Sequence, residues 1–556
     1  MRKKYLLQKA LVFSLVGSMM LGLSGCGEKS SGEVRYESTT TAGYSYDTES
    51  GYYESEACDS AAPTNNTVGA SDFCPEEEWM EPEVEFNTNE YDDLAENSWL
   101  SVKTSPLSTF AADVDTASYT NIRSNIVNGY EVPASSVRIE EMINYFHYDY
   151  EDPKTGEKFA VYTEYADCPW NEDTNLALVS LNTEDIDFSE APDSNLVFLI
   201  DTSGSMFDAD KLPLVQKSLC LLAENLTAKD RVSIVTYAGS DTVVLEGAKG
   251  DDYYTIASAI EQLEAHGSTN GSAGIETAYD IAEEYFIKGG NNRVILCTDG
   301  DLNVGVTSQG ELEKLITKKK ETGVYLSVLG FGYGNYKDNK LETLADKGNG
   351  NYAYIDSTFE AKRALVDEMG ATMVTVAKDV KLQVEFNPAN VKGYRLIGYE
   401  NRTMAAEDFS DDTKDGGEMG AGHTVTAIYE IALTDSEFEI NEPDLKYSND
   451  EAGEEASDEA FANTELFTVN VRYKEPEEDE SKLNSYVCTV DNYNAKGSDN
   501  LRWAAAVAGY GMYLKDSEYM GTTDKELILS LAKSVDDWED DGYKAEFISL
   551  VEEYDK

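Results

Sequence analysis

Short apolar runs alternate with stretches of helical periodicity between Asn195 and about Gly370. The apolar runs, each long enough for one buried strand, are Leu196–Ile200, Val232–Tyr237, Val294–Cys297 and Val324–Leu329. Between them lie segments whose apolar residues stand three and four positions apart, which is the period of a helix. Strict alternation of strand and helix is typical of a mostly parallel sheet with helices on both faces. We therefore expect a doubly wound α/β domain over residues 191–372.

Hydroxyl and carboxylate side chains gather at the predicted strand ends of this domain. Asp201, Ser203 and Ser205 follow one strand directly, Asp299 follows another, and Thr269 lies in a loop before a helix. Because ligands of doubly wound sheets bind at the carboxyl ends of strands, we expect these side chains to converge. All are hard oxygen donors, and such a set suits Mg²⁺, or alternatively Mn²⁺ or Ca²⁺, better than zinc or copper. The Asp-x-Ser-x-Ser run by itself leaves an alternative open, because these residue types also favour turns and helix caps without any metal.

The full set of five residues resembles the metal-ion-dependent adhesion site (MIDAS) of von Willebrand factor type A (VWA) domains, matching it residue by residue. The resemblance implies a Rossmann-like VWA fold and a divalent ion that captures an acidic residue of a protein partner. It also implies that Ser203, Ser205 and Thr269 supply hydroxyl ligands, while Asp201 and Asp299 act directly or through water. Outside this domain the chain is similar to bacterial VWA lipoproteins with a dedicated N-terminal region and a C-terminal domain of unknown function. That similarity covers about 97–556, including the segments 106–110, 113–119, 137–150, 384–402 and 420–431.

The N-terminus has the features of a secretion signal. A basic head precedes the apolar run Ala10–Leu23, which is shorter than the roughly 20 residues that a membrane-spanning helix needs. The run ends in Leu-Ser-Gly-Cys, which resembles the lipobox of bacterial lipoproteins. We expect residues 1–25 to be a lipoprotein signal peptide and Cys26 to carry the lipid; an ordinary signal with a chance cysteine is the alternative. The protein would then be extracytoplasmic and anchored to the outer face of the bacterial cell membrane, or in the outer membrane or periplasm of a Gram-negative cell.

Acidic residues outnumber basic ones by 106 to 44, which gives a formal net charge of −62. A field of that sign repels phosphate backbones, so the composition excludes a nucleic-acid-binding protein. From Tyr36 to Val102 there is no Lys or Arg, and we expect residues 26–100 to be a disordered acidic tether. A tyrosine-rich binding tail is the alternative. The chain has only 3 histidines and 7 cysteines without a CxxC pair, which argues against a His-based metal cluster or a zinc ribbon.

Helices and strands are expected in the N-terminal region, residues 101–190. Two of its segments, Phe159–Thr163 and Leu176–Ser180, are rich in β-forming residues. Asp113 and Asp115 stand just before the helix that is predicted to begin near Ala117, and we expect them to cap that helix; binding of a cation is the alternative.

The C-terminal part divides into a β-rich domain, residues 373–495, and a helical cap, residues 496–556. Apolar residues recur with a period of two in several segments after Ala377, which is typical of a β-sandwich. Neither β-rich region has enough strands for two covered sheets by itself. We therefore expect the strands before and after the α/β domain to pair, so that this domain is inserted in or flanked by one sandwich.

These features predict a cell-surface lipoprotein that binds a protein partner through a divalent cation in its α/β domain. The net charge favours a partner that is basic or neutral overall and presents one acidic side chain to the ion. The alternative is an envelope-organising lipoprotein in which the metal only stabilises the fold. We expect no enzymatic activity, because the sequence has no GxSxG elbow and offers no general base beside the predicted ligands.

Overall fold

The computed structural model describes residues 89–556 except 113–114, 187–190, 268–271, 301–308, 335, 369–373, 441–463, 477, 537–541 and 555. The predicted signal peptide, Cys26, Thr269 and most of the predicted tether lie outside these residues. Within the described ranges, no helix is both long enough and apolar enough to cross a membrane.

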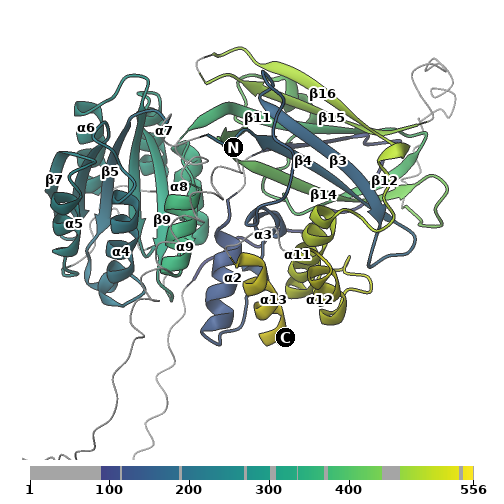
Figure 1. Cartoon of the computed structure of the whole chain (residues 1–556), viewed down its shortest axis with the longest axis horizontal. Helices are drawn as coiled ribbons and strands as arrows, with labels where there is room; N and C mark the ends of the chain where they lie inside the picture. The colour runs from purple at the N-terminus through teal and green to yellow at the C-terminus, as the bar shows by residue number, and fades with distance from the viewer. Residues whose placement is uncertain are drawn as a thin grey trace, which may run out of the picture. The chain divides into compact units, whose positions relative to one another are not determined.

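A six-stranded sheet forms the centre of the α/β domain (Figure 1). Its strands are β5 (Ser194–Asp201), β6 (Arg231–Tyr237), β7 (Asp241–Lys249), β8 (Asn291–Thr298), β9 (Tyr325–Phe331) and β10 (Tyr352–Ile355). They stand in the order β10-β9-β8-β5-β6-β7, and all neighbours are parallel except β6 and β7. The antiparallel edge strand β7 was not predicted, because most of its residues are exposed or half-buried and it lacks an apolar run.

Helices cover both faces of this sheet. They are α4 (Leu212–Ala223), α5 (Tyr253–Glu261), α6 (Ser272–Glu284), α7 (Gln309–Lys320), α8 (Asp338–Lys347) and α9 (Thr358–Lys362), the last continued by the π-helical turn η4 (Arg363–Asp367). Alternate residues of β5 face opposite layers: Phe198 shares a core with α4, α5 and α9, whereas Val197 and Leu199 share one with α6, α7 and α8. Burial of both faces explains why β5 is a continuous apolar run, and it confirms the doubly wound α/β fold.

Strands from both sides of the α/β domain build two antiparallel sheets. The first contains β1 (Leu100–Ser101), β12 (Val391–Ile397), β14 (Thr424–Leu433), β4 (Asn175–Thr183) and β3 (Phe159–Asp167), in that order. The second contains β13 (Gly417–Gly420), β11 (Thr375–Phe386), β15 (Glu465–Lys474) and β16 (Lys482–Thr489), with β2 (Leu107–Ala111) paired to β11. Because β4 pairs with β14, the prediction that strands before and after the α/β domain pair is confirmed.

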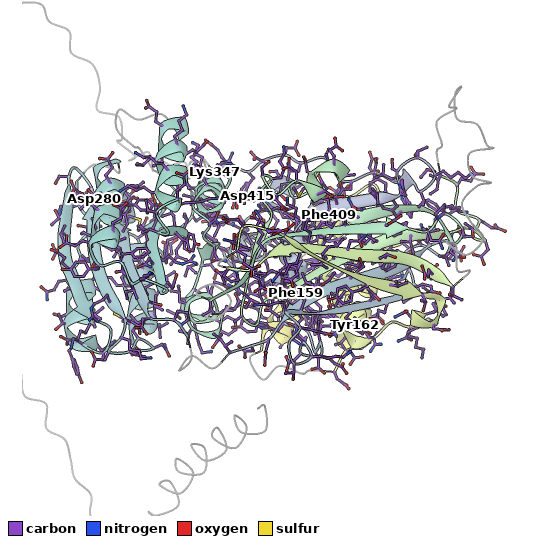
Figure 2. The ribbon with its side chains drawn as sticks, turned by 90° about the horizontal axis from the view of Figure 1, so that it is seen from above. Phe159, Tyr162, Asp280, Lys347, Phe409 and Asp415 are labelled. Atoms are coloured by element: carbon purple, nitrogen blue, oxygen red, sulfur yellow. The ribbon has the colours of Figure 1, made fainter. Side chains whose placement is uncertain are left out.

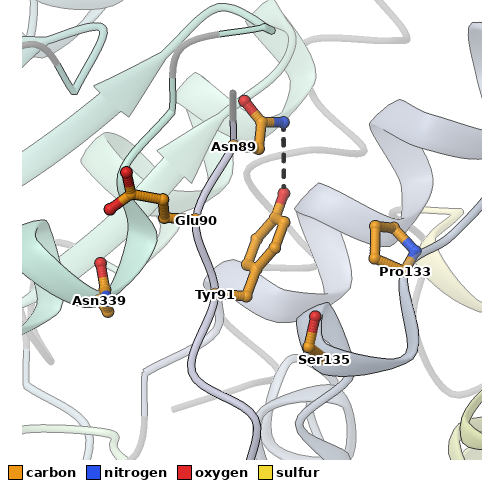
Figure 3. Close-up of a pocket in the computed structure, with 6 residues that line it drawn as sticks. All are labelled: Asn89, Glu90, Tyr91, Pro133, Ser135 and Asn339. Atoms are coloured by element: carbon orange, nitrogen blue, oxygen red, sulfur yellow. Dashed lines mark hydrogen bonds between the residues drawn. The ribbon is translucent and has the colours of Figure 1, made fainter. Parts of the chain in front are cut away.

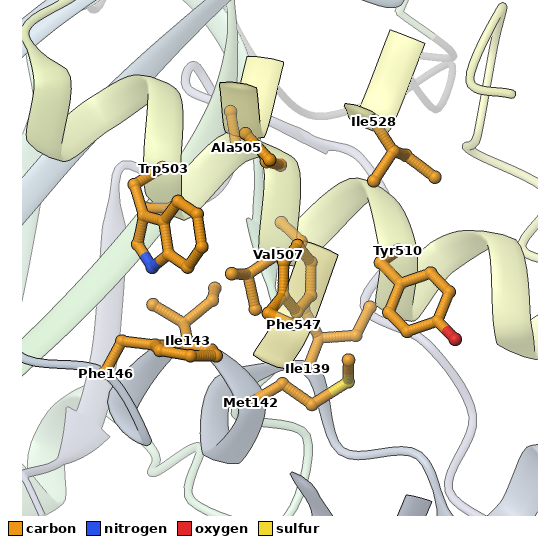
Figure 4. Close-up of a cluster of buried hydrophobic side chains, with 14 of the residues drawn as sticks. Ile139, Met142, Ile143, Phe146, Trp503, Ala505, Val507, Tyr510, Ile528 and Phe547 are labelled. Carbon is orange, nitrogen blue, oxygen red and sulfur yellow. The ribbon is translucent and has the colours of Figure 1, made fainter. Parts of the chain in front are cut away.

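A helical layer packs on the first sheet. Its helices are α2 (Ala117–Val127), α3 (Ile139–Asn144), α11 (Asp499–Lys515), α12 (Lys525–Lys533) and α13 (Tyr543–Glu553), and the short turns η1 (Ala134–Ser136), η5 (Ala406–Ser410) and η7 (Val490–Asn492) lie in the connections. Ile139 and Met142 of α3 meet Trp503 of α11 and Phe547 of α13 in one core (Figure 4). The predicted C-terminal cap therefore shares its interior with helices of the N-terminal region.

Buried ion pairs join the α/β domain to these helices and sheets. Arg123 of α2 lies 2.6 Å from Asp356, and Arg402 lies 3.0 Å from Glu342 of α8. Arg402 also pairs with Asp115 at 3.0 Å, and the other oxygen of Asp115 accepts a hydrogen bond from the backbone N–H of Tyr352. The N-cap residue of α2 is Thr116, and Asp115 binds Arg402 and the backbone of Tyr352, so its carboxylate joins the α/β domain to the sheets. Asp113 lies outside the described residues.

The last residues of the predicted tether also differ from expectation, because residues 89–100 are ordered. Glu90 forms a parallel bridge with Lys337, and its carboxylate lies 2.9 Å from the Lys337 ammonium. The side chains of Asn89, Glu90 and Tyr91 line a pocket with Pro133, Ser135 and Asn339 (Figure 3). An ion pair and backbone hydrogen bonds offset the chain entropy of this acidic segment.

Candidate metal centre

The first predicted metal loop begins at the end of β5. Asp201 is the last residue of this strand, and the short helical turn η3 (Gly204–Phe207) follows. The backbone N–H of Ser203 donates to Asp201 Oδ1 at 2.8 Å, and the Ser203 and Ser205 hydroxyls lie 2.9 Å apart. Asp201 and Ser203 are fully buried, whereas Ser205 is exposed. The loop therefore brings two hydroxyls together above a buried carboxylate, with one hydroxyl open to solvent.

The second loop follows β8, the parallel neighbour of β5. Ile200 pairs with Cys297 in the sheet, so Asp201 and Asp299 emerge at the same edge. Asp299 is 1% exposed. Burial raises the pKa of Asp201 to about 6, and the nearby charge of Asp299 adds to this rise. Two buried carboxylates at one sheet edge favour a cation there.

Thr269, the fifth predicted ligand, lies outside the described residues, but the residues just before it contact the first loop. The backbone N–H of Gly204 donates to the Gly267 carbonyl at 3.1 Å, and the N–H of His266 donates to the Thr202 carbonyl at 2.8 Å. A side chain at position 204 would place its Cβ 3.3 Å from the Gly267 carbonyl oxygen, so glycine here lets the two loops approach without displacing that carbonyl. The His266 imidazole is exposed, with Nδ1 2.8 Å from the Glu264 carbonyl oxygen.

Two further side chains lie beside the predicted ligands, and the sequence did not single out either as part of the site. Lys211 Nζ donates to Asp299 Oδ2 and to the Ser205 carbonyl, both at 3.0 Å. The Thr298 hydroxyl lies 3.5 Å from Asp201 Oδ2 and accepts a hydrogen bond from the backbone N–H of Gly300. The one sequence signal for Lys211 is its place at the start of α4, where a basic residue is unfavourable for the helix dipole.

The described donor set fits a hard divalent cation. It comprises the carboxylates of Asp201 and Asp299 and the hydroxyls of Ser203 and Ser205, all oxygen donors of the kind that Mg²⁺ prefers. Among the described residues no group of three or more His, Cys, Asp or Glu side chains could hold a metal. Among the described residues, the candidate site has two carboxylates, Asp201 and Asp299, and no imidazole or thiolate. It would therefore need the serine hydroxyls as further ligands.

A second hollow lies at the opposite end of the α/β sheet from these loops. This cavity of 260 Å³ is lined by Arg293, near the start of β8, and by Lys347 and Asp415, which are labelled in Figure 2. Arg293 donates to the Ser327 hydroxyl at 2.6 Å, and burial lowers its pKa to about 10. The cavity is therefore separate from the metal loops, which follow the carboxyl ends of β5 and β8.

Comparisons with known families match three successive parts of the chain. The family described as "von Willebrand factor" matches residues 85–178, and "von Willebrand factor type A domain" matches residues 195–368. The family described as "Uncharacterized protein YfbK, C-terminal" matches residues 371–556. Over 473 residues the chain is 42% identical to "Uncharacterized protein YfbK" of Escherichia coli (strain K12), covering 84% of this chain and 81% of that protein. The chain belongs to the YfbK family.

Other proteins share lower identity with this chain. This YfbK-family chain is 31% identical over 170 residues to "Uncharacterized protein sll0103" of Synechocystis, covering 30% of this chain and 39% of that protein. A solved structure described as von Willebrand factor type A from Catenulispora acidiphila is 16% identical and covers 70% of this chain and 88% of its own, with a TM-score of 0.39. The YfbK-family assignment therefore fixes a VWA domain followed by a C-terminal domain of unknown function.

Proposed function

We propose that this protein is a lipid-anchored surface protein whose VWA domain binds a protein partner through a divalent cation. The ligands would be Asp201, Ser203, Ser205, Thr269 and Asp299, and Cys26 would carry the lipid. The observation that supports the metal step is the convergence of two buried carboxylates and two hydroxyls at one sheet edge, with Ser205 exposed. Because the site opens to solvent on the hydroxyl side, a ligand from another molecule could complete it.

Charge balance indicates what such a ligand is. Asp201 and Asp299 supply two negative charges, and Lys211 already neutralises part of the charge of Asp299. A bound Mg²⁺, or Mn²⁺ or Ca²⁺ in its place, would act as a Lewis acid with positive charge left over. An acidic side chain of a protein partner would match that charge. The proposal is for binding and not for catalysis, because the residues placed around the site are ligands and a cation, with His266 turned to the Glu264 carbonyl.

The metal step can be tested by calorimetric titration of the full chain, purified in detergent, with Mg²⁺ and Mn²⁺. We expect saturable binding that falls at least about tenfold in Ser205→Ala, which removes a hydroxyl donor, and in Asp299→Asn, which removes the negative charge of a ligand. Asp280→Ala is the matched control, because Asp280 of α6, labelled in Figure 2, is an exposed carboxylate that is not among the proposed ligands. The metal site would be disproved if the wild-type chain gave no heat of binding, or if both ligand variants bound the ion as tightly as wild type does.

The partner step can be tested by crosslinking on intact cells with and without EDTA. We expect the captured protein to disappear both in EDTA and in Ser205→Ala, and to carry an acidic residue that is needed for capture. If capture is unchanged by EDTA and by the substitution while metal still binds, the ion only stabilises the fold. In that case the protein would be better described as an envelope-organising lipoprotein.

A further inference from the structure

Lys211 places a positive charge inside the candidate metal centre. Its side chain is 8% exposed, and its Nζ lies 3.0 Å from Oδ2 of Asp299, whose side chain is fully buried. The same ammonium donates to the Ser205 carbonyl at 3.0 Å. Lys211 thus contacts one predicted carboxylate ligand and the backbone of one predicted hydroxyl ligand.

The local sequence does not favour a lysine at this place. Lys211 is the N-cap residue of α4 and makes no side-chain capping hydrogen bond. A cation at a helix N-terminus is opposed by the helix dipole, and a buried ammonium loses its hydration. The ion pair with Asp299 offsets both costs, so the position of Lys211 depends on the metal loops and not on the helix that it begins.

The lysine stem is also held by the chain beside it. Gly332 has a φ of +75°, and a Cβ at this position would lie 2.5 Å from both Cγ and Cε of Lys211. The methylenes therefore lie directly against the backbone that follows β9, and a side chain at position 332 would be strained at this φ and would displace them. This packing restricts the ammonium to the neighbourhood of Asp299.

We propose that Lys211 is a resident cation of this centre that competes with the divalent ion for Asp299. The inference rests on the proposed metal site and adds a competing positive charge, which the ligand set alone does not imply. Without the ion, the ammonium neutralises Asp299 and keeps the loops formed. An ion approaching Asp299 is repelled by the ammonium and must displace it from the carboxylate, so Lys211 lowers the affinity for the ion.

The test is calorimetric titration of the full chain with Mn²⁺ alone, combined with thermal unfolding in EDTA and in saturating Mn²⁺. Lys211→Met removes the charge and keeps most of the stem, and Lys211→Gln also keeps a hydrogen-bond donor. Lys217→Met is the matched control, because Lys217 is an exposed lysine of the same helix. We expect both Lys211 variants to bind Mn²⁺ at least tenfold more tightly than wild type and the control. In EDTA they should unfold at a lower temperature than wild type, and saturating Mn²⁺ should reduce that deficit.

The outcomes separate this inference from the proposed function. If wild type and both Lys211 variants bind Mn²⁺ equally, or the variants bind more weakly, Lys211 is a structural ion pair and the metal site stands without it. If only the Lys211 variants bind, the competition is supported, and the wild-type chain does not use the ion as proposed. Absence of binding in all of them would overturn both the inference and the metal site.

Discussion

Arginine side chains in this acidic chain are concentrated in its interior. Basic residues number 44 against 106 acidic ones, yet Arg123, Arg138, Arg363 and Arg395 are each no more than 5% exposed. Arg395 lies 3.1 Å from Glu430, and both side chains are 2% exposed. Loss of one partner from such a pair leaves an uncompensated buried charge. At the scale of single residues, these four arginines are therefore used for internal pairing with buried acids.

His423 gives the residue-scale prediction of pH dependence. Burial lowers the pKa of His423 from its ordinary 6.5 to about 4. As the pH falls below 6.5, the unfolded chain takes up a proton here that the folded chain does not, so protonation favours unfolding. Between pH 7 and pH 5 this residue should cost at most about 2 kcal/mol of stability. In urea unfolding, we expect His423→Gln to lose less stability over that range than wild type.

An exposed histidine provides the control for this pH effect. His266→Gln controls for the loss of a histidine as such, because it removes one whose imidazole is exposed. A His423→Gln variant whose urea midpoint falls with pH as steeply as that of wild type would show that His423 does not contribute.

At the scale of elements, α11 depends on a close approach to α3. A Cβ at Gly511 would lie 2.9 Å from Cγ1 of Ile139 and 3.2 Å from Sδ of Met142. Alanine there gains helix propensity but forces these packed side chains apart, and overpacking costs about 1–3 kcal/mol. We therefore expect Gly511→Ala to lower the thermal unfolding temperature, measured by circular dichroism.

The same helix offers a matched control two residues away. A Cβ at Gly509 would meet its nearest neighbour, Cγ2 of Thr523, at an ordinary 3.4 Å. Gly509→Ala should therefore be neutral or stabilising by up to about 1 kcal/mol, because only the helix propensity changes. Equal destabilisation by both substitutions would mean that the contact with α3 is not the cause.

At the scale of the whole molecule, the first antiparallel sheet needs strands from both sides of the VWA domain. β14 pairs with β4 along eight successive residue pairs, Thr424–Ile431 against Asn182–Asn175. A fragment of residues 374–556 lacks β3 and β4, so β14 would keep an unpaired, apolar edge. We expect this fragment to be insoluble alone and to become soluble when residues 89–186 are co-expressed, as measured by co-purification.

The VWA domain serves as the comparison for this fragment experiment. All six strands of its sheet lie between Ser194 and Ile355, so residues 191–372 contain every pairing that the sheet needs. Circular dichroism of mixed helix and strand from that fragment, together with failure of 374–556 alone, would support the inserted arrangement. A soluble, folded 374–556 fragment would contradict it.

Periodicity was sufficient to predict the α/β domain, because the central strands and most of the helices there carry their own local signal. β5 is apolar on both faces, and α4 repeats its apolar residues at helical spacing. The strands β7 and β16 lacked such signals because they are edge strands with largely exposed or half-buried residues. Asp201, Ser203, Ser205 and Asp299 could be named in advance because the ends of adjacent parallel strands must meet at one edge.

The sequence by itself determined the fold class of the central domain and four of the side chains now found at its sheet edge. Only the tertiary structure decided which strand pairs with β4 and that Lys211 lies against Asp299, 88 residues along the chain. The physical reason is that periodicity reports on neighbours within a few residues. Contacts between distant segments depend instead on complementary surfaces. Pairs of buried charges, such as Lys211 and Asp299, are decided only when the core has formed and has brought the two side chains together.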